Sequence, residues 1–327
     1  MRVIFKLLRS ALLAALLVTA IFAALAFWPA STRPLEAHIA PAANYEAART
    51  RAATLLAHPS AEVRPECRSF ILDHGQRTRD AYVLLHGLTN CPAQFRRLGE
   101  ELYASGANVI VLRLPDHGFT NRMTNQAANL TAQGMLDVGN EAVDLARGYG
   151  ERVIVIGLSI NGVTAAWLAQ QRADVDLAVV VSPFFAPNGL PDAAIPPLTN
   201  LLLRLPNAFI WWDAEKKQAL PGSPYSYPRF ATRSIGETMT LGLDVFRRAQ
   251  AAPPLARHIL LVTSPADTAI SHQRVADLAA LWKGRATALS FPAEWKIPHD
   301  CIDPAQPGGN IALVYPQLRA WIDTALR

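Results

Sequence analysis

Three residues far apart in the chain, Ser159, Asp267 and His299, have the types and the order that nucleophilic catalysis requires. A serine hydroxyl is a weak nucleophile at neutral pH, so it needs a base to take its proton and an acid to orient that base. The charge that develops on a substrate oxygen also needs hydrogen-bond donors. The three side chains predict this chemistry, with Ser159 as nucleophile, His299 as base and Asp267 as the orienting acid.

The segment around Ser159 predicts a strand, a sharp turn and a helix. The β-branched run at 153–156 is typical of a buried strand, glycines at 157 and 162 frame the turn, and apolar residues at 165–169 favour a helix. Such a turn exposes the seryl oxygen and directs the next backbone N–H, that of Ile160, toward the same point. Taken alone, the stretch also fits an ordinary turn whose serine caps the helix.

The positions of Asp267 and His299 fit a shared site. Asp267 stands just beyond an apolar strand expected at 259–263, and His299 follows a strand expected at 288–291 through a loop. Functional groups of parallel sheets collect at the carboxyl ends of the strands. Taken singly, Asp267 could also be a helix-capping aspartate and His299 a surface histidine, so the interpretation depends on the combination.

A further apolar strand at 81–85 ends in His86-Gly-Leu88-Thr. The site needs a backbone N–H from the turn after this strand to bind the oxyanion, and Leu88 is best placed to supply it alongside Ile160. We therefore expect Leu88 and Ile160 to be the oxyanion donors. His86 is expected to be a structural residue of the turn rather than a second base.

The rest of the chain alternates strand-like and helix-like segments. Strands are expected at 67–72, 81–85, 108–112, 152–156, 177–181, 259–263 and 288–291, and helices at 92–106, 135–145, 275–282 and 318–322. The first two strands look like a pair joined across 74–76. Short apolar strands that alternate with amphipathic helices predict an α/β fold with a mostly parallel sheet covered on both faces.

The chain contains the motifs His86-Gly-Leu-Thr-Asn-Cys-Pro, Leu114-Pro-Asp-His-Gly and Gly157-Leu-Ser-Ile-Asn-Gly, followed by Asp267 and His299. With this combination it resembles the serine α/β-hydrolases of the carboxylesterase and monoacylglycerol-lipase type, from about Cys67 to its end. The resemblance implies the α/β-hydrolase fold, the triad Ser159, Asp267 and His299, oxyanion donors at Leu88 and Ile160, and no cofactor or metal. The chain departs from the family's pattern at Asn161, where the turn usually has a small residue.

The connection between the strands at 177–181 and 259–263 is too long for a simple loop. It is rich in proline and in large apolar residues, and we expect a cap over the site at about 184–240. Phe209, Trp211 and Trp212 are its predicted substrate contacts, which would favour acyl or other hydrophobic substrates. A packed insertion without substrate contact is the alternative.

The first 28 residues predict a signal anchor. Arg2, Lys6 and Arg9 precede an apolar run of membrane-spanning length at 11–28, so the body should lie outside the cytoplasm. A secreted form cleaved after Ala26 is the alternative. An Ala/Pro-rich stalk with a short helix is expected at 29–65 and the hydrolase domain at 66–327. These three charges supply most of the net charge of +5, so the basic pI gives no support for nucleic-acid binding.

Three cysteines, Cys67, Cys91 and Cys301, are too few for a disulfide scaffold and match no zinc pattern. In an exported protein one pair can be oxidised, and Cys67 with Cys91 is the favoured of three pairings. Free buried thiols are the alternative.

These observations predict a membrane-anchored, exported serine hydrolase that cleaves small hydrophobic or acyl esters through an acyl-enzyme. A thioesterase or acyltransferase would use the same triad. The alternative from another class is a catalytically inactive hydrolase fold that serves as an interaction module of the cell envelope. The natural substrate and the oligomeric state are left open.

Overall fold

A seven-stranded sheet organises the body of the protein, as seen in a computed structural model that describes all residues except 1, 31–33, 58–59, 221 and 307. Its strand order is β1-β3-β2-β4-β5-β8-β9. The strands are β1 (Phe70–Leu72), β2 (Thr78–Leu85), β3 (Asn108–Val111), β4 (Gly150–Leu158), β5 (Leu177–Val181), β8 (His258–Thr263) and β9 (Ala286–Ser290). All neighbours are parallel except β1 and β3. The predicted mostly parallel sheet is confirmed.

The predicted pairing of the first two strands is wrong. β1 pairs antiparallel with β3, which lies between β1 and β2. The Asn108 side chain shows why, because it accepts a hydrogen bond from the His74 N–H and donates one to the Gln76 carbonyl, both at 2.8 Å. The turn that should have closed a local hairpin is therefore bound to the start of β3.

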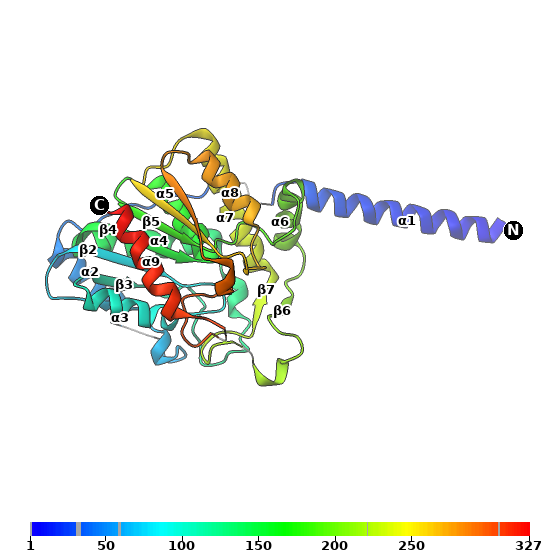
Figure 1. Cartoon of the computed structure of the whole chain (residues 1–327). Helices are drawn as coiled ribbons and strands as arrows, with labels where there is room; N and C mark the ends of the chain where they lie inside the picture. The colour runs from blue at the N-terminus through cyan, green and yellow to red at the C-terminus, as the bar shows by residue number, and fades with distance from the viewer. Residues whose placement is uncertain (1, 31–33, 58–59, 221, 307) are drawn as a thin grey trace.

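Helices cover both faces of the sheet, and Figure 1 shows α9 crossing one of them. The helices of the body are α3 (Arg96–Ala104), α4 (Ala132–Tyr149), α5 (Ile160–Gln171), α7 (Thr232–Ala251), α8 (His272–Leu281) and α9 (Ile311–Ala325). Val153 and Val155 of β4 pack in one core cluster with α4, α5, α7 and α8. Ile154 and Ile156 pack in the other, with α3 and α9, because successive strand residues point to opposite faces.

The amino-terminal part contains α1 (Arg2–Phe27) and α2 (Tyr45–Leu56). Helix α1 projects away from the body (Figure 1). Within the segment predicted as a stalk, α2 packs on the body: Ala48 and Ala52 are buried, and the Arg51 guanidinium pairs with Glu141 of α4. The boundaries predicted for the anchor, the stalk and the hydrolase domain stay predictions.

The chain between β5 and α7 forms the insertion that we call the cap, residues 184–231. It contains η4 (Asp192–Ala194), α6 (Ile195–Arg204), η5 (Lys217–Ala219) and a two-stranded antiparallel sheet of β6 (Phe209–Trp211) and β7 (Arg229–Ala231). Helix α7 then contributes Leu241 and Val245 to the main core. Four further 3₁₀ turns are η1 (Pro65–Cys67), η2 (Pro92–Phe95), η3 (Gln126–Asn129) and η6 (Ala293–Trp295).

Candidate active site

Ser159 occupies a strained turn between β4 and α5, as the pattern of its segment predicts. Its backbone has φ 61° and ψ −117°, a conformation that is uncommon for a residue with a side chain. The turn is tight enough that a Cβ on Gly157 would lie 2.0 Å from the Asn161 carbonyl oxygen. A glycine at 157 is therefore required, and the serine is held at the carboxyl end of β4.

His299 lies between Ser159 and Asp267. Its Nε2 is 2.8 Å from Ser159 Oγ, and its Nδ1 is 2.8 Å from Asp267 Oδ2. Asp267 follows β8 and is buried. Burial disfavours its charged form, but hydrogen bonds from His299 and from the Ala269 N–H outweigh this, so the pKa of Asp267 lies below its usual value. The fold thus brings the three predicted residues into one hydrogen-bonded chain.

Asp300 is the immediate neighbour of His299 in sequence, but its side chain contacts residues other than the imidazole. Its Oδ2 accepts hydrogen bonds from Gln94 Nε2 at 2.8 Å and from Asn90 Nδ2 at 3.2 Å. Burial and the nearby Asp303 carboxylate raise the pKa of Asp300 to about 6. Asp267, from the end of the neighbouring strand, is therefore the carboxylate that contacts the imidazole.

The N–H groups of Leu88 and Ile160 fit the predicted oxyanion donors. Both residues line the cavity that contains Ser159 and His299. Within the described part of the chain, neither N–H group donates a hydrogen bond to a protein acceptor. Both are therefore available to a substrate oxygen.

His86 has a structural role, as expected. Its Nε2 accepts a hydrogen bond from the Leu114 N–H at 3.1 Å, and its Nδ1 lies 3.0 Å from the Gly87 carbonyl oxygen. Burial, with a smaller contribution from the neighbouring His117, lowers the pKa of His86 to about 3. A fully buried imidazole with both nitrogens bonded cannot serve as a second base.

The cavity at Ser159 has a volume of about 610 Å³. Trp212 lines it, and the Trp212 indole N–H donates a hydrogen bond to the Thr89 hydroxyl at 3.0 Å. Phe209 and Trp211, which the sequence also predicts as contacts, do not line it. They alternate with Ile210 and with Trp212, which directly follows β6, and they pack under the Arg229 guanidinium and the Lys217 ammonium respectively. For these two residues the prediction needs correction.

Two polar residues of this site, Asn90 and Gln94, were not predicted. Gln94 Oε1 accepts a hydrogen bond from the Gly87 N–H at 2.8 Å, while its Nε2 binds Asp300. Gln94 therefore joins the loop of the oxyanion donors to the loop of His299. The sequence contains no signal that separates it from any other glutamine near a helix start, because its partners lie far away in the chain.

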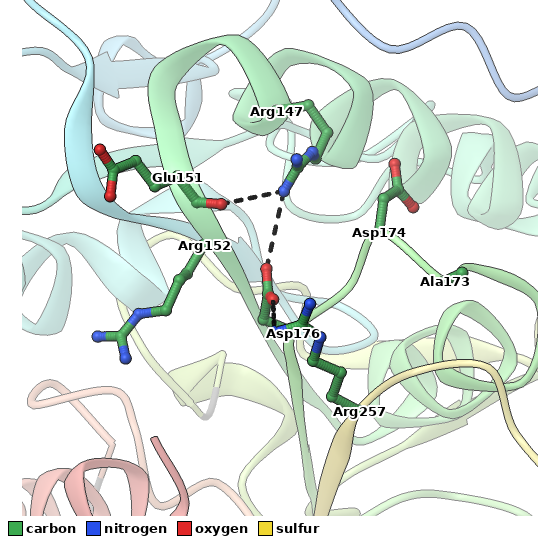
Figure 2. Close-up of a pocket in the computed structure, with 7 residues that line it drawn as sticks. All are labelled: Arg147, Glu151, Arg152, Ala173, Asp174, Asp176 and Arg257. Carbon is green, nitrogen blue, oxygen red and sulfur yellow. Dashed lines mark hydrogen bonds and ion pairs between the residues drawn. The ribbon is translucent and has the colours of Figure 1, made fainter. Parts of the chain in front are cut away.

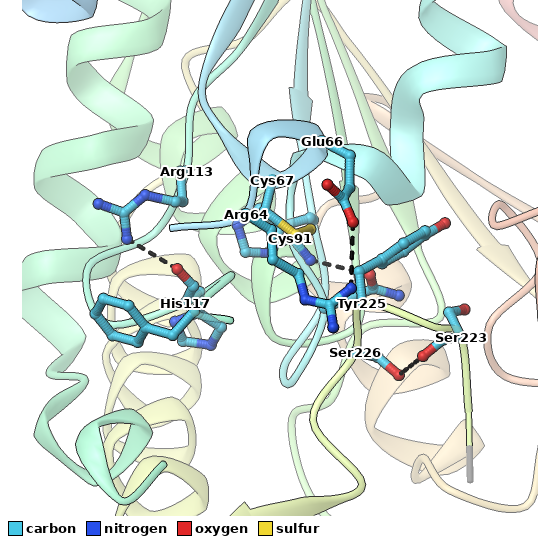
Figure 3. The surroundings of a disulfide bond; sticks show 12 residues. Arg64, Glu66, Cys67, Cys91, Arg113, His117, Ser223, Tyr225 and Ser226 are labelled. Atoms are coloured by element: carbon cyan, nitrogen blue, oxygen red, sulfur yellow. Dashed lines mark hydrogen bonds and ion pairs between the residues drawn. A yellow bond between two sulfur atoms is a disulfide. The ribbon is translucent and has the colours of Figure 1, made fainter. Parts of the chain in front are cut away.

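A disulfide joins Cys67 to Cys91, so the favoured pairing is confirmed, and Cys301 is a buried free thiol. Figure 3 shows this bond between η1 and the loop that follows β2, with Tyr225 and Ser226 of the cap nearby. Gly118 packs against it, since a Cβ on this glycine would lie 2.5 Å from the Cys67 Cβ. The bond thus fixes the loop three residues after Leu88.

A second cavity, of about 420 Å³, lies near the amino-terminal end of β4, at the opposite end of this strand from Ser159 (Figure 2). Asp176 in this cavity lies 3.7 Å from Arg147 and 3.6 Å from Arg257, while Arg152 pairs with Asp80 and Asp174 with Arg172. This cavity is far from Ser159, which stands at the other end of β4. Among the residues described, no cluster of His, Cys, Asp and Glu side chains could hold a metal ion.

Solved structures with the same fold include lipolytic enzymes. The chain is similar to a structure reported for LipS and LipT, two metagenome-derived lipolytic enzymes, with 18% identity and a TM-score of 0.61 over 80% of this chain and 99% of that one. For the Paleococcus ferrophilus monoacylglycerol lipase the values are 17%, 0.59, 79% and 99%. For Est1E from Butyrivibrio proteoclasticus with bound ferulic acid they are 14%, 0.53, 79% and 95%.

The sequence also identifies the family to which the chain belongs. No curated protein sequence matches the chain. Residues 82–299, which extend from β2 to His299, match the model of the Alpha/beta hydrolase family. This match spans most of the chain and includes Ser159, Asp267 and His299. The chain therefore belongs to the alpha/beta hydrolase family.

Proposed function

We propose that this protein is a serine hydrolase that cleaves carboxylic esters through an acyl-enzyme. The observation that carries the proposal is the hydrogen-bonded chain from Ser159 through His299 to Asp267, with distances of 2.8 Å on both sides of the imidazole. A neutral imidazole in this position can accept the seryl proton, and a buried carboxylate behind it fixes the tautomer and stabilises the imidazolium.

In the first half of the reaction, His299 Nε2 takes the proton of Ser159 while the seryl oxygen attacks the ester carbonyl. The N–H groups of Leu88 and Ile160 bind the resulting oxyanion. His299 then gives the proton to the leaving alcohol, and the acyl group stays on Ser159. In the second half, water attacks the acyl-enzyme with His299 again as base, and the products are a carboxylic acid and an alcohol.

The cavity supports a hydrophobic acyl group as the bound part of the substrate. Its wall includes apolar residues from the body and from the cap, which are Leu88, Leu158, Ile160, Phe184, Trp212 and Ile235. Apolar cavities of this size bind small hydrophobic ligands with a few polar groups to orient them. Lipolytic enzymes, a monoacylglycerol lipase and an esterase with bound ferulic acid share the fold, which is consistent with this substrate class.

Covalent labelling with a fluorophosphonate tests the nucleophile. We expect the parent protein to be labelled and to hydrolyse simple esters, and Ser159→Ala to lose both while it keeps the melting temperature of the parent. Ser226→Ala is the matched control, because Ser226 also lines the cavity but donates its hydroxyl to the Ser223 carbonyl. Labelling that persists in Ser159→Ala would reject the assignment, and a folded parent that is never labelled would favour an inactive interaction module.

A panel of esters of graded acyl length, with matched thioesters and amides, defines the reaction. We expect esters to be cleaved fastest, with a preference for apolar acyl groups. A preference for thioesters, or transfer of the acyl group to an added alcohol in place of water, would assign the same three residues to a thioesterase or an acyltransferase.

We also propose that α1 is a retained membrane anchor with the body outside the cytoplasm. Ile4–Phe27 is long enough and apolar enough to cross a membrane, and the positive charges of Arg2, Lys6 and Arg9 lie at its amino-terminal end. The Cys67–Cys91 disulfide is consistent with an oxidising compartment. A reporter that is active only outside the cytoplasm, fused after Arg33, should be active. Release of a shortened soluble form during carbonate washing would favour signal cleavage instead.

A further inference from the structure

The carboxyl-terminal end of α1 is bound by two side chains of the cap helix α6, Asn200 and Arg204. Asn200 Nδ2 donates a hydrogen bond to the Ala26 carbonyl at 2.7 Å, and its Oδ1 accepts one from the Ala30 N–H at 2.9 Å. The Arg204 guanidinium donates to the carbonyls of Leu25, Trp28 and Pro29. We call Asn200 and Arg204 the clamp.

The clamp satisfies a specific need of α1. The last carbonyls of a helix have no partner within the helix, and the negative end of its dipole favours a cation. Arg204 supplies both the donors and the charge. The bound carbonyls of Ala26 and Trp28 flank Phe27, so the clamp encloses the peptide bond at which a signal peptidase would separate α1 from the body. The contacts therefore match a helix that remains attached.

Beyond α1 the chain returns to the body almost at once. The Leu35 carbonyl accepts a hydrogen bond from Arg248 at 2.8 Å, and the Ala40 N–H donates one to Asp144 at 2.9 Å. Few residues are thus left to separate the body from a membrane. The 24-residue apolar segment is about 36 Å long, which is enough to cross a bilayer core of about 30 Å.

The cap lies on the side of the body from which α1 projects. Figure 1 shows α6 and β6 at this side, with the sheet on the side away from α1. Four large apolar residues of these segments are exposed: Phe27 and Trp28, at and just after the end of α1, by 76% and 73%, and Ile210 of β6 and Trp212 just after it, by 48% and 49%. Aromatic side chains of this kind favour the boundary between water and lipid. Trp212 also lines the cavity, so the wall of the cavity reaches this surface.

We propose that the clamp joins the membrane anchor to the cap and holds this surface against the bilayer, so that acyl esters dissolved in the membrane reach Ser159 directly. The inference rests on the proposed ester hydrolysis and on the retention of α1. It assigns α1 a role in catalysis beyond attachment. Its partner is the lipid surface itself.

Vesicles of phosphatidylcholine that contain the full-length protein test the proposal. Two rates are measured, one for a long-chain ester dissolved in the vesicles and one for a short-chain ester dissolved in water. In the double variant Asn200→Ala with Arg204→Ala we expect the first rate to fall about tenfold and the second to change less than about twofold. Arg247→Ala is the control for loss of an arginine, because Arg247 is exposed on α7 and pairs with Asp244. An equal loss of both rates, or no loss, overturns the proposal.

Hydrogen exchange tests the clamp without reference to activity. In the parent protein the Ala30 amide should be protected, because its N–H is bound to Asn200. In the double variant, exchange at the Trp28 and Ala30 amides and in α6 should accelerate, while the sheet exchanges as in the parent. Unchanged exchange at these residues rejects the clamp. A labelled, folded parent that cleaves neither ester would reject the proposed function, whereas the exchange result would still decide whether the clamp exists.

Discussion

The Asn161 side chain donates a hydrogen bond of 2.6 Å to the backbone carbonyl of His86. This contact joins the turn of the nucleophile to the loop that carries Leu88. Asn161 is buried and also accepts a hydrogen bond from the Thr164 hydroxyl at 2.8 Å. The residue that departs from the family's usual turn therefore connects the two segments that supply the oxyanion donors.

We predict that Asn161→Ala lowers kcat by about tenfold with little change in KM, because the loop of Leu88 loses its contact with the nucleophile turn. It should also destabilise the fold by about 1–3 kcal/mol, since the His86 carbonyl is left buried without this donor. Thr164→Val is the control. It removes the other hydrogen bond of Asn161 but keeps the contact with His86, so its kcat should stay near that of the parent. Equal kcat values for all three proteins would contradict the role of Asn161.

Two carboxylates lie near His299, and substitution separates their roles. Asp267→Asn should lower kcat by about 10⁴-fold, because the amide favours the wrong tautomer of the imidazole and cannot stabilise its charged form. Asp300→Asn should lower kcat far less, since Asp300 contacts Gln94 and Asn90 rather than the imidazole. The measurement is kcat of both variants on a simple ester. A severe loss only in Asp300→Asn would identify Asp300 as the orienting acid.

The raised pKa of Asp300 also predicts that the stability of the fold depends on pH. Its pKa is about 6 in the folded protein, against an ordinary value of 3.8, so the folded state binds this proton more tightly than the unfolded state. The contribution of Asp300 to the free energy of unfolding therefore falls as the pH rises from about 4 to about 6, and the penalty is complete above that range. Asp300→Asn lacks this titration. Its melting temperature should rise relative to the parent between pH 4 and pH 7, and a difference that does not vary with pH would be evidence against the raised pKa.

The Cys67–Cys91 bond should contribute both stability and loop position. It closes a loop with a sequence separation of 24 residues, for which the loss of unfolded-state entropy corresponds to about 3 kcal/mol. We expect the double variant Cys67→Ser with Cys91→Ser to melt at a lower temperature and to have a reduced kcat, because the loop after Leu88 loses its covalent attachment. A reductant should lower the melting temperature of the parent and leave the double variant unchanged. Free thiols at both positions in peptide mapping would exclude the bond.

The parts of this site that could be predicted depend on local sequence and on general properties of parallel sheets. The strand, turn and helix around Ser159 are encoded within sixteen residues, and the carboxyl ends of parallel strands necessarily bring Asp267 and His299 to the same edge. The contacts of Gln94, the pairing of β1 with β3 and the packing of α2 on α4 could not be predicted. Each depends on partners remote in sequence, and the residues involved have no distinctive spacing.

The cap illustrates this limit and gives the last prediction. Composition identified a group of aromatic residues, but the alternation of side chains along β6 and into Trp212 decides which of them reach the cavity, because one step along an extended chain exchanges the two faces. Trp212→Ala should raise KM for an apolar ester by about tenfold, because it removes a large apolar part of the cavity wall. Trp211→Ala is the matched control and should leave KM near the parent value, since this indole lies beside Lys217 outside the cavity.

Trp212→Phe keeps an aromatic ring but lacks the hydrogen bond to Thr89, so it distinguishes apolar contact from loop position. A larger effect of Trp211→Ala than of Trp212→Ala would show that the other face of β6 contacts the substrate.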